Sequence, residues 1–313
     1  MKQTKMLIFG LVFALFLVPG LTFGINVADV TQTGDSNVAA INQNATDHTA
    51  TITQTGNENN ALVDQMLSGS YSGGVATITQ IGNKNDADSL DYGGDQSSHV
   101  SIIYQEGNEN IGYQLYTSGQ SWNGNKGTIN QYGYKNEARQ TFGYLGTDYS
   151  SQLKAEQRGD LNYAEQKSAR NGNFGDIYQE GNSNQARQDL GGRTNMADTD
   201  QVGNLNIASI VILGNDNIAT QTQAGNLNLA SISQSGGDFN KAYQTQTGGN
   251  SNDAGIIQAG NSNTGTQIQT GDSNVARLTQ TGNSNVASQT QTGNGFSSTV
   301  IQLGNVNNAV VVQ

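Results

Sequence analysis

Apolar and polar side chains alternate along short segments over nearly the whole chain. One such segment has Asn228, Ala230, Ile232 and Gln234 alternating with Leu229, Ser231 and Ser233. A period of two places every second side chain on the same face, which is typical of a β-strand. The pattern therefore predicts an all-β fold built from many short strands.

The strands are separated by copies of one motif, Q-x-G-x-x-N-x-A, which first begins at Gln32 and then at Gln54. Its glycines are 22 to 26 residues apart up to Gly203 and 11 or 12 residues apart after it, so each earlier unit hides a degenerate second copy. This gives 24 half-repeats, or twelve full repeats. Glycine, asparagine and aspartate suit tight turns, so each half-repeat is predicted to be one strand and one turn. The predicted turn glycines are Gly34, Gly56, Gly82, Gly107, Gly133, Gly159, Gly181, Gly203, Gly225, Gly271, Gly282 and Gly304.

The residue two places after the motif alanine indicates that two half-repeats form one turn of the chain. Aliphatic residues and glutamine alternate there along the series Ile210, Gln221, Ile232, Gln244, Ile256, Gln267, Leu278 and Gln289. If one turn takes 22 residues, one sheet carries an aliphatic column and the facing sheet carries a glutamine column, whose stacked amides form a ladder. The last copy departs from the series, with Val311 where glutamine is expected.

These spacings predict a β-solenoid of about twelve two-strand rungs over residues 25–313. At ~4.8 Å per rung it would be ~55–60 Å long, with a thin core and with each rung supported mainly by its neighbours. Besides the series above, the predicted core ladder includes Gln32, Asn37, Gln54, Asn59, Gln80, Asn85, Gln201, Asn206, Gln223, Asn228, Gln234 and Asn274.

The composition excludes several function classes. Only 12% of the 313 residues are charged and 34% are hydrophobic, whereas a globular enzyme is about a quarter charged and nearly half apolar. The net charge of -11 argues against a nucleic-acid partner, because binding phosphates needs a basic surface. With no cysteine, disulfides and thiolate metal sites are excluded, and no cofactor is expected.

The first 24 residues are predicted to be a secretory signal peptide. Lys2 and Lys5 precede an apolar run over residues 6–18, and small residues follow it. The run is too short to span a bilayer of ~30 Å. Cleavage is expected after Gly24, with Ala28 as the alternative. The only proline, Pro19, falls in this segment, so the rest of the chain can use nearly every backbone N–H in strand ladders.

The offsets of glutamine, glycine, asparagine and alanine, as in Gln223, Gly225, Asn228, Ala230 and Gln234, resemble the curlin repeat. The resemblance covers residues 30–313 and involves an extended number of repeats. It implies a secreted major subunit of curli, the extracellular amyloid fibres of bacterial biofilms, on the surface of a Gram-negative-type bacterium. It also implies export through a dedicated outer-membrane pore and a nucleator subunit as partners. The nucleators of this family tend to have a basic final repeat, whereas this chain ends in uncharged residues.

The two ends of a solenoid are open sheet edges, which can pair with another chain. The predicted polymerisation edge is the final strand, with Asn307, Ala309, Val311 and Gln313, and the first rung between Gln32 and Gln43 offers the matching edge. Head-to-tail addition does not close on itself and therefore gives a filament of copies of this chain.

The sequence allows two roles for several other residues. His48 and His99 occupy the asparagine position of degenerate half-repeats, either as polar turn residues or as a metal or pH-sensing pair. Asp35 and Asp272 occur in turns, where they could bind calcium or discourage wrong edge pairing. Repeated Thr-x-Thr pairs are either an ice-binding array or ordinary exposed strand residues.

Tyrosines are concentrated between Tyr71 and Tyr178, and Trp122 lies among them. Many fall in the longer spacers at 68–74, 91–97, 117–124 and 141–150, which should line one edge of the solenoid. They are either variable surface loops or an aromatic strip that binds matrix polysaccharide.

No arrangement of residues indicates catalysis, so the chain is not expected to be an enzyme. The alternative to a fibre subunit is a monomeric solenoid adhesin that binds glycan through the aromatic edge. A solenoid polysaccharide hydrolase is a third reading, but it would need acids clustered in a groove.

Overall fold

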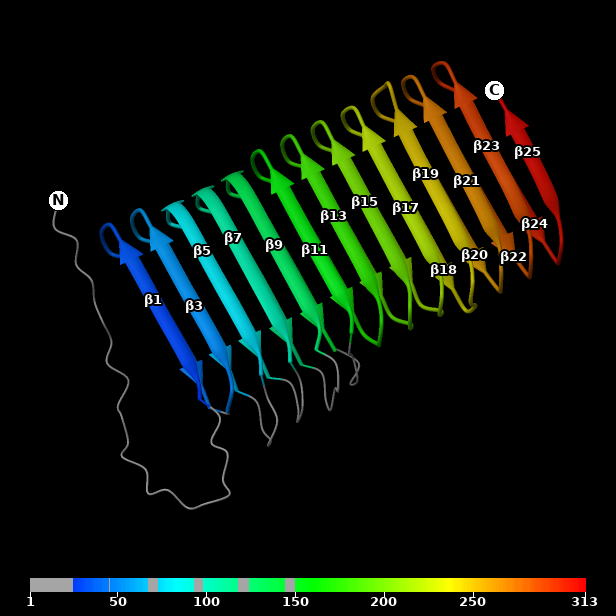
Figure 1. Cartoon of the computed structure of the whole chain (residues 1–313). Coiled ribbons are helices and arrows are strands. Elements are labelled where there is room, and N and C mark those ends of the chain that lie inside the picture. The colour runs from blue at the N-terminus through cyan, green and yellow to red at the C-terminus, as the bar shows by residue number, and fades with distance from the viewer. Residues whose placement is uncertain (1–24, 45, 67–72, 93–97, 118–123, 144–149) are drawn as a thin grey trace, which may run out of the picture.

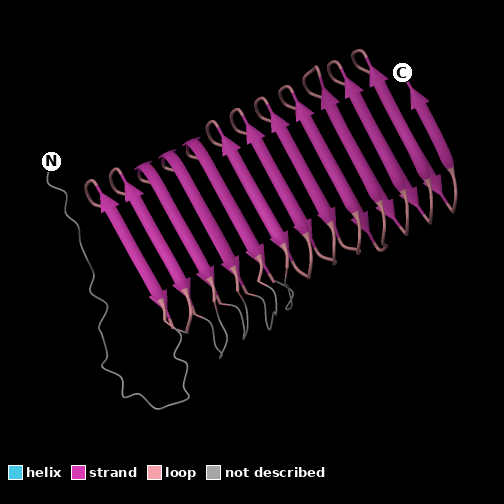
Figure 2. Ribbon diagram, in the orientation of Figure 1, coloured by secondary structure: helices cyan, strands magenta, loops and turns pink. Residues whose placement is uncertain are grey.

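The computed structural model describes the chain over residues 25–44, 46–66, 73–92, 98–117, 124–143 and 150–313. The predicted signal peptide, Trp122 and most of the longer spacers lie outside these residues. Within them the chain is built of strands and turns without a helix (Figure 2).

The strands form two sheets that the chain visits in turn. The first sheet contains β1 (Val27–Thr33), β3 (Thr49–Thr55), β5 (Val75–Asn83), β7 (Val100–Asn108), β9 (Lys126–Tyr134), β11 (Gln152–Arg158), β13 (Phe174–Glu180), β15 (Met196–Val202), β17 (Ile218–Ala224), β19 (Lys241–Thr247), β21 (Thr264–Thr270), β23 (Val286–Thr292) and β25 (Asn308–Val312). The second sheet contains β2 (Val38–Gln43), β4 (Asn60–Gln65), β6 (Asp86–Asp91), β8 (Ile111–Tyr116), β10 (Glu137–Phe142), β12 (Tyr163–Ser168), β14 (Gln185–Leu190), β16 (Ile207–Ile212), β18 (Leu229–Ser235), β20 (Asp253–Ala259), β22 (Val275–Thr281) and β24 (Ser297–Leu303).

Each strand pairs in parallel with the strand two positions along the chain. The register is strict, with Gln32 beside Gln54 in the first sheet and Ala208 beside Ala230 in the second. Figure 1 shows the strands as one continuous row, with β1 and β25 at opposite ends. This confirms the predicted β-solenoid of about twelve turns.

The sheets hold 13 and 12 strands, one more strand in total than the 24 half-repeats predicted. Each half-repeat is defined by its turn motif, and 24 turns join 25 strands. The chain therefore makes twelve two-strand rungs and then one further strand, β25, in the first sheet.

Every interior strand points three side chains inward, and their type sets the thickness of the core. The first is usually alanine, the second is aliphatic or glutamine, and the third is usually glutamine, as in Ala50, Ile52 and Gln54 of β3. Alternate residues face outward and are partly exposed, including the Thr-x-Thr pairs such as Thr220 and Thr222. The core is thin, as predicted, and it contains more buried amide than aliphatic side chains along the first sheet.

The turns use glycine for a reason beyond flexibility. Gly203 has φ 118°, and a Cβ atom added to it would lie 1.9 Å from the carbonyl oxygen of Gly225 in the next rung. The left-handed residue that follows in the turns is an aspartate, as predicted, only at Asp47 and Asp216 among the described residues, and it is never asparagine there. It is usually the residue just before the motif asparagine, such as Leu205 (φ 59°) or Ser262 (φ 56°), because the asparagine side chain is needed inside the turn.

Replacing a stacked turn glycine should destabilise the solenoid strongly. We expect Gly203→Ala to lower the free energy of unfolding by about 3 kcal/mol, because the methyl group meets backbone of the next rung and the φ angle is strained. Gly236→Ala is the matched control: its φ is 68° and nothing lies within 4 Å of the added Cβ, so about 1 kcal/mol is expected. Urea denaturation of both variants measures the difference, and equal losses would contradict the stacking explanation.

Candidate assembly interface

An unbroken ladder of glutamines runs through the first sheet from end to end. The Nε2 of each glutamine donates to the Oε1 of the glutamine in the next rung, with N···O distances of 2.7–2.9 Å. The ladder consists of Gln32, Gln54, Gln80, Gln105, Gln131, Gln157, Gln179, Gln201, Gln223, Gln246, Gln269, Gln291 and Gln313. All donors point toward the C-terminal end, so the ladder has a direction and both its ends are open to a further amide.

Asparagines form a second kind of ladder at each edge of the solenoid. The Oδ1 of Asn206 accepts the backbone N–H of Asn228 at 3.0 Å, and the Nδ2 of Asn206 donates to the carbonyl of Gly225. The same pattern holds at the predicted positions Asn37, Asn59, Asn85 and Asn274. The asparagine side chain therefore ties its own turn to the next turn along the solenoid, and its backbone N–H donates to the asparagine of the preceding turn.

The aliphatic and glutamine columns are as predicted only in the C-terminal half. There Ile210, Ile232, Ile256 and Leu278 stack in the second sheet, and Gln221, Gln244, Gln267 and Gln289 stack in the first. In the N-terminal half the columns exchange sheets. Ile52, Ile78, Ile103 and Ile129 lie in the first sheet, and Gln114, Gln140, Gln166 and Gln188 lie in the second.

The exchange takes place at Thr199. This residue stacks between Ile177 and Gln221 in the first sheet, and its Oγ1 accepts the Nε2 of Gln188 from the second sheet. The glutamine column thus passes from one sheet to the other across the core. The Oε1 of Gln221 has no hydrogen-bond partner, because Thr199 stands where a preceding glutamine would donate. The prediction of one sheet for each column was wrong for this half of the chain.

His48 and His99 take the asparagine position, as one of the two readings predicted, but they are buried instead of lying on a turn surface. The Nδ1 of His99 accepts the N–H of Asn125 at 2.9 Å, and the Nδ1 of His48 accepts the N–H of Gly74 at 3.2 Å. The Nδ1 of each imidazole therefore accepts a backbone N–H of the next rung, as an asparagine Oδ1 does at this position. Burial lowers the pKa of His99 to about 4, although the Oδ1 of Asp91 lies 3.9 Å from its Nε2, and it lowers the pKa of His48 as well.

The His99 pKa predicts a loss of stability in acid. His99 takes up a proton near pH 6.5 in the unfolded chain but only near pH 4 in the folded chain. The free energy of unfolding is therefore unaffected by this group above pH 6.5. It falls by about 2–3 kcal/mol as the pH drops from 6.5 toward 4. His99→Asn keeps an acceptor for the Asn125 N–H and removes the titrating group. Urea denaturation at pH 7 and pH 4.5 should show a smaller acid loss for the variant, and equal losses would contradict this role.

A short aromatic stack replaces the amides beside His99. The rings of His99 and Tyr116 are 4.9 Å apart, and those of Tyr116 and Phe142 are 4.7 Å apart. Phe142 and Asp91 fall within the predicted surface spacers, but they end strands β10 and β6 and are buried. The spacers begin one residue or more after these strand ends.

Tyrosines are not gathered on one edge in the part of the chain that the structure describes. Tyr104 and Tyr178 face outward from the first sheet, Tyr113 and Tyr163 face outward from the second, and Tyr92 stands beside a spacer. Most of the spacers that would form the predicted aromatic strip, Tyr71 included, lie outside the described residues, so the strip stays a prediction.

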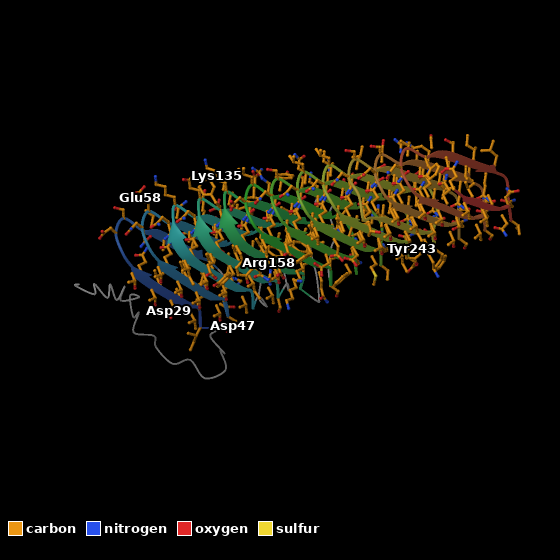
Figure 3. All side chains as sticks on the ribbon, turned by 90° about the horizontal axis from the view of Figure 1, so that it is seen from above. Asp29, Asp47, Glu58, Lys135, Arg158 and Tyr243 are labelled. Carbon is orange, nitrogen blue, oxygen red and sulfur yellow. The ribbon has the colours of Figure 1, made fainter. Side chains whose placement is uncertain are left out.

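The outer faces carry charges in pairs along and between neighbouring strands. Arg187 contacts Glu165 at 3.6 Å and Asp189 at 3.7 Å on the second sheet. On the first sheet, burial and the neighbouring carboxylates of Asp200 and Asp176 raise the pKa of Asp198 to about 6. Figure 3 shows the outward side chains along the whole length, with Asp29 and Asp47 at the β1 end.

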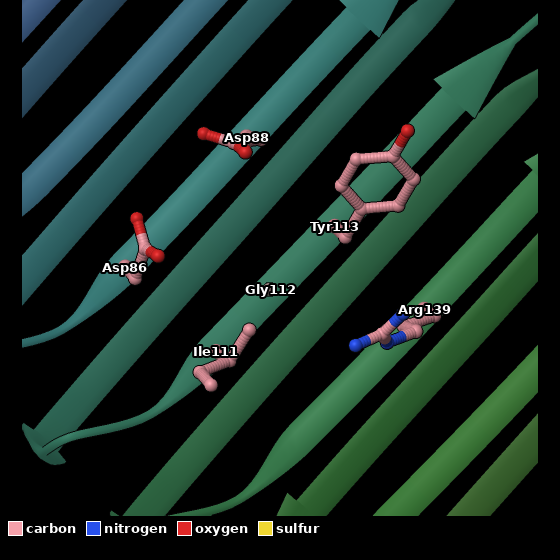
Figure 4. Close-up of a pocket in the computed structure, with 6 residues that line it drawn as sticks. All are labelled: Asp86, Asp88, Ile111, Gly112, Tyr113 and Arg139. Carbon is pink, nitrogen blue, oxygen red and sulfur yellow. The ribbon is translucent and has the colours of Figure 1, made fainter.

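A shallow depression on the second sheet shows no catalytic arrangement. It lies over Gly112 between β6, β8 and β10, with Asp86 and Asp88 on one side and Arg139 on the other (Figure 4). Arg139 already donates to Glu137, which neutralises it. The described residues contain no group of three acidic or histidine side chains that could hold a metal ion, and they include no helix long and apolar enough to cross a membrane.

The two ends of the solenoid are open sheet edges. Among the strands that the structure describes, β25, which carries Ala309 and Val311 and follows Asn307, pairs only with β23, and β1 pairs only with β3. The prediction placed the C-terminal edge on the final strand alone and did not include β24. β24 pairs only with β22 and β2 only with β4, so each end exposes one strand of each sheet.

All four end strands present the same inward sequence, a small residue, an aliphatic residue and glutamine. The triplets are Ala28, Val30, Gln32 in β1; Ala39, Ile41, Gln43 in β2; Ser298, Val300, Gln302 in β24; and Ala309 and Val311 in β25 with Gln313 directly after it. At the middle inward position, from the third rung on, an aliphatic side chain in one sheet faces a polar side chain in the other. At both ends this middle position is aliphatic in both sheets. The two ends therefore match each other in shape and chemistry.

Comparison with protein families connects this geometry to a known repeat. The family described as "Curlin associated repeat" matches residues 26–56, which contain β1, β2 and β3. This segment is similar to a curlin repeat. The matched curlin repeat contains the first glutamine and asparagine rungs and the turn glycines Gly34 and Gly56. A search of curated proteins finds no match.

The strand stacking of the matched segment continues well beyond residues 26–56. Strand after strand stacks on it in the same register, with the same glutamine ladder through to Gln313. The curlin repeat suggests a curli-like structural subunit. The two long stacked sheets of this chain are consistent with a scaffolding role. The residues that carry the repeat are therefore those that build the scaffold.

Proposed function

We propose that this chain is a secreted subunit that polymerises end to end into extracellular amyloid fibres of a bacterial biofilm matrix. The observation that carries the proposal is the pair of matching open ends. The backbone groups on the outer sides of β1, β2, β24 and β25 have no strand partner, and the inward triplets at both ends are the same.

The ends lack the features that natural proteins use to block edge pairing. Such features are prolines, charged inward residues, bulges or a covering helix. Among the described residues, the four end strands have none of these on their inward faces. Addition of one copy to another would extend both sheets and bury four aliphatic side chains.

End-to-end addition joins two different surfaces of each copy. Such a contact is heterologous and does not close, so it produces a filament and not a dimer. The strands would stay perpendicular to the filament axis, which is the cross-β arrangement of amyloid. The interior of each copy already has this arrangement, so growth needs no refolding of the rungs that are in place.

The curlin repeat extends the proposal to partners. We propose that the chain is exported through an outer-membrane pore of the curli type and that a nucleator subunit starts its polymerisation at the cell surface. Matrix polysaccharide is a further proposed partner. The role of this chain would be that of the main fibre subunit, in support of adhesion and biofilm cohesion.

Seeded growth of residues 25–313 tests the proposal. The purified chain should show a lag in amyloid-dye fluorescence at neutral pH, and a few per cent of sonicated fibres should abolish the lag. Fibres in the pellet should carry the dye signal. A chain that stays monomeric and rich in β-structure at high concentration, with or without seeds, would contradict the proposed function.

A further inference from the structure

The strand count decides how one copy can follow another. The chain climbs the solenoid by half a rung per strand, alternating between the sheets, and ends with β25 in the first sheet. The next strand of a continued solenoid would therefore lie in the second sheet, on the open side of β24. That is the position which the first strand of an incoming copy has to take if no gap is left.

We infer that successive copies in the fibre are rotated by a half-turn about the fibre axis, so that β1 of the next copy pairs with β24 and its β2 pairs with β25. This inference rests on the proposed function, because it describes the contact between copies in the fibre. It concerns the partner of each end strand, which end-to-end growth alone does not specify.

The half-turn keeps the strands parallel. The two sheets run in opposite directions, because consecutive strands cross the solenoid back and forth (Figure 1). A rotation of a half-turn exchanges the sheets and also reverses the strand direction of each. β1 of the next copy thus arrives on the second sheet running the same way as β24, and its inward side chains still point inward.

The side chains match in this arrangement. Val300 would stack on Val30 of the next copy, and Val311 would stack on its Ile41, which makes an aliphatic cluster across the joint. Gln302 and Gln313 end ladders in which each Nε2 donates to the Oε1 of the next rung, so they would donate to Gln32 and Gln43 of the next copy. Asn307 is the last asparagine of its ladder and would accept the N–H of the next copy's Asn37.

Addition without rotation fits less well. β1 of the next copy would then pair with β25, and its β2 would lie two strand positions from β24, which leaves one strand missing from the second sheet. The backbone groups of both flanking strands would stay unpaired in the joint, at a cost for each. The outer faces differ too. Without rotation Asp29 lies beside Val310, which is 70% exposed; with rotation the small apolar Ala40 lies there.

Cysteine cross-linking distinguishes the two arrangements, because the chain has no cysteine of its own. The pair Asp29→Cys with Thr299→Cys reports the half-turn, since these outward residues would be neighbours on β1 and β24. The pair Asp29→Cys with Val310→Cys reports addition without rotation. Within one copy β1 lies ~55 Å from β24 and from β25, so a short thiol cross-linker can join only different copies.

Fibre formation by each double variant is checked first, by sedimentation and dye fluorescence, and the cross-linker is added afterwards. We expect Asp29→Cys/Thr299→Cys fibres to give a ladder of covalent multimers on a denaturing gel and Asp29→Cys/Val310→Cys fibres to stay monomeric. The reverse result, or fibres in which neither pair cross-links, would overturn the half-turn. Absence of fibres in the wild-type chain would instead contradict the proposed function.

Discussion

Replacing Val311 with aspartate should stop fibre growth at the C-terminal end. Val311 is the middle inward residue of β25, directly above Gln289, and an incoming copy would seal it inside the joint. A carboxylate enclosed there without a partner costs several kcal/mol. A loss of about 3 kcal/mol corresponds to an elongation rate at least ~100-fold lower at neutral pH. Seeded dye kinetics with wild-type seeds measures the rate.

Val312→Asp is the matched control for this prediction. Val312 is the next residue of the same strand, but it points outward and is 74% exposed, so the same charge remains in water. Its elongation rate should stay within about threefold of the wild type, as expected of a surface substitution. Circular dichroism of both soluble variants should match the wild type, because only the last strand is altered. Equal inhibition by the two variants would show that the inner face of β25 is not the growth surface.

Replacing Gln223 with glutamate should unfold the middle of the solenoid at neutral pH. Gln223 accepts the Nε2 of Gln201 and donates to the Oε1 of Gln246 at 2.9 Å and to the carbonyl oxygen of Ile207 at 3.0 Å. A carboxylate has the same shape but cannot donate, so it would face two acceptors in a buried position. We expect a loss of about 3–5 kcal/mol in the free energy of unfolding, measured by urea denaturation.

The same variant should show a reversed pH dependence. Burial would raise the pKa of the new carboxyl group above its unfolded value of about 4.3, so the folded state binds the proton more tightly. The stability of Gln223→Glu should therefore rise as the pH falls toward that value. Thr222→Glu places the same charge on the outward face of the same strand and should cost less than about 1 kcal/mol. Similar losses in both variants would rule out the amide ladder as the main source of the effect.

The strands, their parallel stacking and the inward glutamines could be predicted because the sequence repeats at a constant distance. In a solenoid of fixed turn length, residues one period apart stack directly, so a position such as Gln223 is placed by its spacing from Gln201 and Gln246. The exchange of columns at Thr199 was visible in principle. Gln188 and Gln221 are three half-repeats apart, an odd number, which puts them in opposite sheets.

Other features depend on contacts that the repeat does not encode. His99 and Phe142 fall in degenerate half-repeats, where polar or variable residues resemble surface loops, yet they fill space between rungs that lack an amide. The odd number of strands places the last strand in the same sheet as the first, which counting turn glycines such as Gly34 and Gly304 does not reveal. The triplet shared by all four end strands becomes meaningful only when both ends are known.

The mass per unit length of single fibres tests end-to-end polymerisation most directly. A fibre in which each copy continues the sheets of the last should contain one chain for every ~60 Å, the length of twelve and a half rungs at ~4.8 Å each, and should diffract at the spacing of one rung. Scanning transmission electron microscopy of unbundled fibres gives this value. One chain for every ~5 Å, as in fibres where each chain adds a single layer, would contradict the end-to-end contact.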